Sequence, residues 1–134
     1  MSKAVSILNP WMGVAFAICV ALQYNDPDPY LWMPMYGAAT AACILHSSSR
    51  LRPWMSATVG VVALVWALTI APRVLGQGGF GHMFESMKAS NPLIEESRET
   101  GGLLIVFAWM AALSIASAAR AKAARATGSG AAGA

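Results

Sequence analysis

The chain has 134 residues, of which 57% are hydrophobic and 11% are charged, and a formal net charge of +3; its mean hydropathy is +0.54. A soluble domain carries about 25% charged residues, so this deficit, gathered into long uncharged runs, excludes an ordinary soluble domain and indicates an integral membrane protein. The basic residues form no single surface patch of the kind that nucleic acid requires, so we expect no nucleic-acid partner.

Four apolar stretches approach or exceed the length of about 17 residues that a membrane-spanning helix needs. The predicted spans cover residues 7–24, 30–46, 54–71 and 101–119. In the first, Asn9 suits the cap and Pro10 the first helical position, and in the third, Pro53 suits the start and Pro72 the end. The sequence therefore predicts an all-α membrane protein, a four-transmembrane-helix bundle over residues 1–119.

Two further segments complete the chain. The connection over about 72–100 begins with a glycine-rich part, and Asn91-Pro92 then predicts a helix start whose helix runs on through Gly101-Gly102 into the fourth span. This long outer loop is thus expected to contain short helical segments, and the placement of segment 76–91 relative to the membrane stays open. Residues 120–134 are basic and then Gly/Ala/Ser-rich, which predicts a disordered tail.

Lysine and arginine residues predict the orientation, because they are enriched in cytoplasmic loops. Six of them fall on one side of the predicted bundle and three on the other; the six are Lys3, Arg50, Arg52, Arg120, Lys122 and Arg125. Both termini are therefore expected in the cytoplasm, and the inner membrane of a bacterium is the expected location. Tyr24, Tyr30 and Trp32 are expected in the outer aromatic belt, and His46 at the inner interface.

All six acidic residues fall in two segments that an even number of spans brings to the outer face. The first is Asn25-Asp26-Pro27-Asp28-Pro29, where each proline holds the preceding aspartate out of helical geometry. A rigid turn in which Asp28 caps the second span is one interpretation. A site at which Asn25, Asp26 and Asp28 present oxygens to a cation or substrate is the other.

The second acidic segment is Glu95-Glu-Ser-Arg98-Glu99, in which Glu95 and Glu99 share one helix face and repel each other unless a partner offsets the charge. A solvated helix start with an internal ion pair to Arg98 is one interpretation, and a cluster facing Asp26 and Asp28 is the other. Together these carboxylates have enough oxygens for a divalent cation. The candidate metal ligands are Asp26, Asp28, Glu95, Glu99 and His82.

Small and polar residues within the spans predict how the helices pack. Small residues four apart, such as Gly37 and Ala41, Ser56 and Gly60, or the alanines 108, 112 and 116, allow close helix approach in lipid. Thr40, Thr58, Thr69 and Ser114 are expected to bond back to their own helices, and Gln23 to hydrogen-bond across the outer mouth. No ionisable residue lies at mid-membrane, which argues against a proton relay or an ion-coupled carrier.

The run Gln23-Tyr-Asn-Asp-Pro-Asp-Pro-Tyr-Leu-Trp32, with Tyr36 following, resembles the signature of the transmembrane protein 220 family. The run Glu95-Glu-Ser-Arg-Glu-Thr-Gly-Gly-Leu103 is similar to that family's second motif, an Arg-Glu pair followed by Gly-Leu. The resemblance covers about residues 5–118. It implies a small four-span membrane protein, names no reaction, and directs attention to Gln23, Asn25, Asp26, Asp28, Trp32, Tyr36, Glu95, Arg98 and Glu99.

The sequence shows no Ser/His/Asp or Cys/His arrangement, which favours a role without catalysis. The leading hypothesis is an accessory or scaffold subunit of a larger membrane complex, in contact with the bilayer and with other membrane subunits or further copies of the chain. One alternative is a membrane enzyme or metal-binding protein that uses the outer carboxylates, with a divalent cation as its cofactor. Another is a pigment- or lipid-binding subunit with His46 or His82 as axial ligand.

Overall fold

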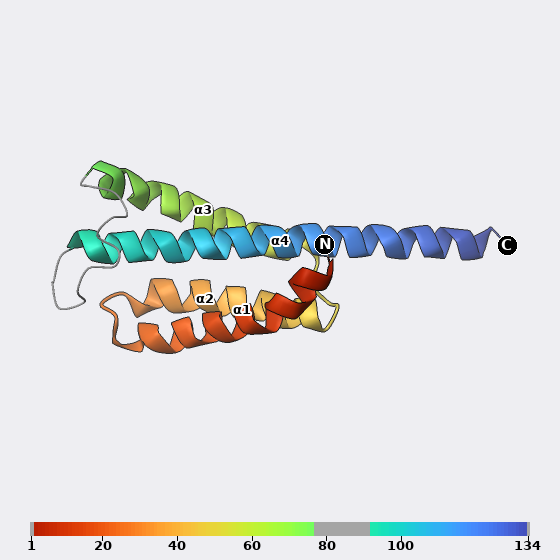
Figure 1. Ribbon diagram of the computed structural model, residues 1–134, viewed down its shortest axis with the longest axis horizontal. Coiled ribbons are helices and arrows are strands. Elements are labelled where there is room, and N and C mark those ends of the chain that lie inside the picture. Colours follow the sequence, from red (N-terminus) through yellow and green to blue (C-terminus); the bar gives the residue numbers. More distant parts are fainter. Residues whose placement is uncertain (1, 77–91, 134) are drawn as a thin grey trace.

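The structure, a computed structural model, describes residues 2–76 and 92–133, and its regular elements there are all helices, as predicted. These elements are α1 (Ser2–Leu22), the short 3-10 helix η1 (Gln23–Asn25), α2 (Pro29–Ser47), α3 (Pro53–Gly76) and α4 (Pro92–Ala132). They form two antiparallel pairs, α1 with α2 and α3 with α4 (Figure 1). The pairs meet mainly through α2, which contacts both α3 and α4, whereas the described parts of α1 and α3 do not touch.

Three of these helices are long and apolar enough to cross a membrane, namely α1 with η1, α3 and α4. The shorter α2 has 19 residues and contains Pro34. It contacts all three other helices, and its buried residues recur along its whole length: Trp32, Met35, Tyr36, Ala39, Ala42, Cys43 and His46. A helix that faces protein on several sides needs fewer strongly apolar side chains than one that faces lipid.

The first helix begins earlier than predicted, which corrects the role given to Asn9 and Pro10. Because α1 starts at Ser2, Asn9 lies in its third turn and Pro10 lies inside the helix. A proline there removes one backbone hydrogen bond and bends the helix, and Figure 1 shows the first turns of α1 inclined to the rest. Proline is tolerated inside membrane helices because neighbouring groups satisfy the freed carbonyl.

The third helix passes through Pro72 and ends at Gly76, so the prediction that Pro72 closes it was wrong. The extra turn has packing to support it, because Val74 is completely buried. Arg73, in the same turn, forms an ion pair with α4. These tertiary contacts offset the hydrogen bond that the proline cannot donate to the carbonyl of Leu68.

The fourth helix runs without interruption from Pro92 to Ala132, which confirms the predicted start at Pro92 and the passage through Gly101-Gly102. The tail beyond residue 119 is helical rather than disordered, and it extends past the rest of the bundle (Figure 1). Alanine has the highest helix propensity, and the run Ala116–Ala124 holds six alanines in nine residues. The predicted disorder gave too much weight to the glycines that follow.

Close packing of α3 against α4 follows the small residues of α3. Ser56, Gly60, Ala63 and Ala67 are buried, and a Cβ at Gly60 would lie 3.2 Å from the Cβ of Met110. The predicted packing role of Ser56 and Gly60 is confirmed. In contrast, a Cβ at Gly37 would meet nothing within 4 Å, and Ala41 is exposed, so that pair faces away from the described bundle.

Candidate functional site

The turn between α1 and α2 carries the first acidic motif at one end of the bundle. Its backbone is fixed locally: the Asp26 N–H donates to the Gln23 carbonyl at 3.0 Å, and the Asp28 N–H donates to Asp26 Oδ1 at 3.2 Å. Asp28 occupies the N-cap of α2, followed by Pro29, but its side chain makes no capping hydrogen bond. Asp26, not Asp28, therefore stabilises the turn through its carboxylate, and Asn25 and Asp28 are exposed.

Two motif residues from different helices meet just inside this end. The Tyr36 hydroxyl of α2 lies directly against Gly102 of α4, where any Cβ would overlap it. Glu99, one turn before Gly102, is close enough to Tyr36 to interact with it electrostatically. The structure thus brings the first and second motifs together through Tyr36, Glu99 and Gly102, although the prediction placed the meeting at the aspartates.

An aromatic cluster continues from Tyr36 across three helices. Trp32 and Trp66 stack with ring centroids 4.4 Å apart, and Tyr36 has neighbours at 6.2 Å (Trp32) and 6.4 Å (Phe16). Trp32 is buried, so it belongs to the core and not to the outer aromatic belt. Tyr24 and Tyr30 are exposed, as belt residues are. Stacked aromatic pairs favour one register of the helices over others.

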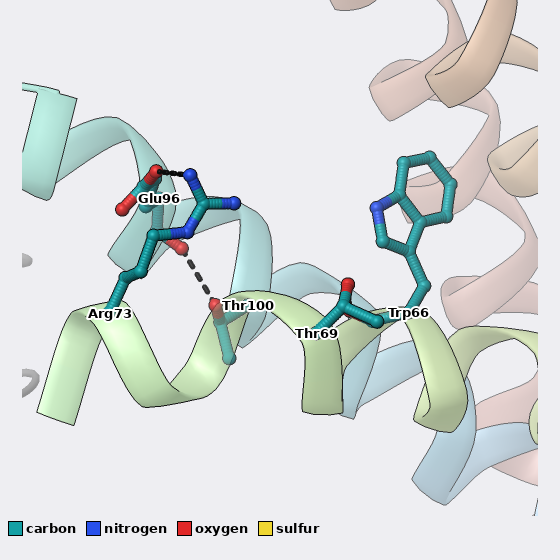
Figure 2. A network of polar contacts seen from close by, with 5 residues as sticks. All are labelled: Trp66, Thr69, Arg73, Glu96 and Thr100. Atoms are coloured by element: carbon teal, nitrogen blue, oxygen red, sulfur yellow. Dashed lines mark hydrogen bonds and ion pairs between the residues drawn. The ribbon is translucent and has the colours of Figure 1, made fainter.

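Glu96 of the second acidic motif pairs with α3. The guanidinium of Arg73 forms an ion pair with the carboxylate of Glu96, with Nη1 and Oε1 3.0 Å apart. Figure 2 shows this guanidinium reaching from α3 across to α4. In the next turn of α4, the Thr100 hydroxyl donates to the Glu96 carbonyl at 2.8 Å. Glu96 is the more enclosed partner, with its side chain 22% exposed against 64% for Arg73. Arg98 is exposed.

Part of the predicted carboxylate cluster lies outside the described residues. Among the described side chains of residues 3–76 and 96–133, no three His, Cys, Asp or Glu groups lie close enough to hold a metal ion. His82 and the side chain of Glu95 fall outside the described residues. The metal site therefore stays a prediction, and so does the pairing of Glu95 with Arg98.

A second polar centre, absent from the predictions, lies near the opposite end of the bundle around Asn9. Its side chain is 1% exposed and joins three helices. Nδ2 donates to the Cys43 carbonyl at 2.8 Å and to Ser47 Oγ at 3.0 Å, both on α2. Oδ1 accepts from the Trp109 indole of α4 at 3.3 Å. A buried amide with all of these partners specifies one arrangement of the helices.

His46 and Arg120 add a second link at this end. His46 is buried within the protein, and its predicted depth at the inner interface stays a prediction. The Arg120 guanidinium donates to the His46 carbonyl at 3.3 Å and lies 3.5 Å from its Nε2. Ser114, one of four residues predicted to bond to their own helix, instead donates to the Pro53 carbonyl at 3.0 Å. Thr40, Thr58 and Thr69 do bond to their own helices.

Of the contact residues that sequence reasoning did not identify, Asn9 could have been found from the sequence. Asn9 is a strongly polar side chain inside an apolar run, and such a group in a membrane helix usually finds a partner on another helix. The contact between Tyr36 and Gly102 left no comparable local signal, because the two residues are 66 positions apart.

The comparison with known families agrees with the two motifs. The model of transmembrane family 220, helix, matches residues 15–115, which include both motifs and three quarters of the chain. No solved structure shows a significant match. With its membrane-spanning helices and with Trp32, Tyr36 and Glu99 inside the matched region, the chain belongs to transmembrane family 220.

Proposed function

We propose that this protein is a non-catalytic accessory or scaffold subunit of a larger membrane complex, built as a four-span bundle with both termini in the cytoplasm. The single observation that carries the proposal is how the polar side chains are used. Asn9, Arg73, Glu96, Ser114 and Arg120 all bond across helices, which stabilises the bundle, and these links are spread from one end of it to the other.

The fourth span in this proposal is α2. At 1.5 Å per residue its 19 residues extend about 28 Å, close to the roughly 30 Å of a hydrocarbon core. It lies antiparallel beside α1 over most of its length (Figure 1). A helix in that position crosses the bilayer if α1 does, and its low hydropathy is acceptable because the aromatic cluster and the Asn9 contacts cover much of it.

The proposed orientation places the acidic end outside. The α1–α2 turn and the start of α4 lie at one end, and the α2–α3 connection and the C-terminal extension lie toward the other (Figure 1). Six Lys and Arg residues belong to the second end, which supports its proposed position on the cytoplasmic side of a bacterial inner membrane. Exposed Tyr24 and Tyr30 flank the outer turn.

A partner subunit is proposed to bind at this outer turn. Tyrosine is enriched in the energetically important parts of protein interfaces, and the turn is held rigid by the bonds of Asp26 to Asp28 and Gln23. A rigid surface loses little conformational entropy on binding. The same turn holds the helix ends in place, so the outer polar residues have both a structural and a docking role.

The test is native mass spectrometry of the protein extracted gently from its own membrane, with Asp26→Ala and Glu99→Ala variants. Release with a defined larger complex, together with loss of assembly or stability in the variants, supports the accessory role. Ser6→Ala, an exposed change on α1, is the matched control. The proposal fails if the chain is released alone, or if both variants leave assembly and stability unchanged.

A further inference from the structure

A groove lies on the outer surface of the bundle between α1 and α2, toward the basic end. Its volume is about 560 Å³, and its walls include Pro10, Gly13 and Ala17 of α1 and Thr40, Ile44 and Ser48 of α2. Gly13 forms part of its floor, where a Cβ would lie 3.2 Å from the Cβ of Cys43. The helices approach closely there, and the small α1 residues leave the space above the contact empty.

The polar groups on the walls are already paired, so the groove presents an apolar surface. Thr40 Oγ1 donates to the Tyr36 carbonyl at 2.8 Å, and Ser48 Oγ donates to the Ile44 carbonyl at 2.9 Å. Asn9, at the end of the groove, directs its amide to Cys43 and Ser47. An occupant gains apolar contact from these walls, since the Thr40 and Ser48 hydroxyl protons are already donated to backbone carbonyls.

The dimensions favour a slender occupant. From Asn9 to Ala17 on α1, and from Thr40 to Ser48 on α2, the groove extends about 12 Å at 1.5 Å per residue. The walls along that length carry mostly small side chains, which leaves room for an extended hydrocarbon chain to lie along the groove.

Cationic side chains stand at one end of the groove. Arg50 follows Ser48 by two residues and is exposed. Lys3, also exposed, stands in the first turn of α1, at the same end of the bundle. The acidic residues whose side chains are described, Asp26, Asp28, Glu96 and Glu99, belong to the opposite end (Figure 1). A negatively charged headgroup is complementary to this end of the groove.

We propose that the groove holds one acyl chain of an anionic phospholipid, whose headgroup phosphate binds at Arg50 and Lys3. This inference concerns the isolated chain and does not depend on the accessory role. Each basic residue near a membrane surface strengthens the binding of anionic lipid about fivefold. A phospholipid that combines chain contact with two cations is retained when bulk lipid is removed, and a zwitterionic lipid with the same chains is retained less.

Lipid retention by the purified full chain tests the proposal, with dioleoylphosphatidylglycerol and dioleoylphosphatidylcholine supplied in equal amounts in mixed micelles. Native mass spectrometry counts the bound lipids. Ala17→Phe fills the groove from an exposed position, and Ala108→Phe adds the same ring at an exposed position on α4 outside the groove. Arg50→Gln removes a headgroup contact, and Arg125→Gln removes a distant tail charge. Circular dichroism confirms that each variant keeps its helices.

The expected result is one retained phosphatidylglycerol, preferred at least about fivefold over phosphatidylcholine. Ala17→Phe should reduce retention on the order of tenfold, equivalent to removing about two methylenes from contact, and Arg50→Gln should reduce the preference about fivefold. The proposal is overturned if Ala17→Phe behaves like Ala108→Phe, or if Arg50→Gln behaves like Arg125→Gln. Cross-linking from position 17 to a protein subunit instead of to lipid would also overturn the proposal.

Discussion

Replacing Gly102 with alanine tests the contact through which the two sequence motifs meet. The added methyl would overlap the Tyr36 hydroxyl and lie 3.5 Å from the ring carbon that carries it. Tyr36 cannot swing away freely, because its ring is buried between Phe16 and Trp32. Overpacking of this kind costs about 1–3 kcal/mol, while alanine in a helix regains about 0.5–1 kcal/mol relative to glycine. A net loss of about 1 kcal/mol is expected.

Gly37→Ala is the matched control, since it makes the same change inside a helix where a Cβ meets nothing within 4 Å. It should stabilise the protein by about 0.5–1 kcal/mol. Tyr36→Phe provides a second check, because removing the hydroxyl leaves only the 3.5 Å contact, an ordinary van der Waals distance. In the Tyr36→Phe background, Gly102→Ala should therefore become neutral or stabilising, which gives a coupling energy of about 1–3 kcal/mol.

The free energies of unfolding are measured for the unmodified protein, Gly102→Ala, Tyr36→Phe, the double variant and the Gly37→Ala control. Each protein is unfolded reversibly in mixed detergent micelles, and circular dichroism follows the loss of helix. Equal effects of Gly102→Ala and Gly37→Ala would refute the close approach of α2 and α4. So would a Gly102→Ala effect that is unchanged by Tyr36→Phe.

Three further changes probe the other polar links. Asn9→Ala should destabilise the bundle by about 1–3 kcal/mol, because it removes the buried hydrogen bonds to the Cys43 carbonyl, to Ser47 and from the Trp109 indole; unfolding in micelles measures this, and a change no larger than that of Ser6→Ala would contradict it. A double-mutant cycle on Arg73 and Glu96 should give a coupling below about 1 kcal/mol that decreases with salt, since Arg73 is largely exposed; a larger, salt-independent coupling would show a buried pair. Ser114→Ala should cost about 0.6 kcal/mol, the average for hydrogen bonds between membrane helices, and a loss above about 2 kcal/mol would indicate a role beyond this bond to Pro53.

Apolar runs were sufficient to predict where the four helices lie, because a stretch such as 54–71 has few other ways to satisfy its backbone in lipid. The helix ends were harder to predict at prolines. Pro10 and Pro72 have the same local sequence effect as Pro53, yet only Pro53 begins a helix. The difference comes from tertiary contacts, such as the burial of Val74 and the pairing of Arg73, that continue a helix through a proline.

For the candidate site, too, the general position could be predicted from the sequence and the individual contacts could not. The resemblance directed attention to Trp32, Tyr36 and Glu99, and the sequence predicted both motifs at one end of the bundle, where the structure also has them. The sequence did not identify which atoms meet, because Gly102 has no side chain and Asn9 lies far along the chain from Trp109. Contacts of that kind depend on the rotation of each helix about its axis, which the small-residue patterns constrain only partly, as exposed Ala41 illustrates.

Cysteine accessibility in intact cells tests the four-span topology most directly, since both the accessory role and the position of the lipid groove are interpreted within it. A single cysteine replaces Tyr30, 88% exposed at the start of α2, or the exposed Ser49 just after its end. A membrane-impermeant maleimide should label Tyr30→Cys in intact cells and Ser49→Cys only after permeabilisation. Labelling of both positions from the same side would show that α2 does not cross the membrane and would contradict the account.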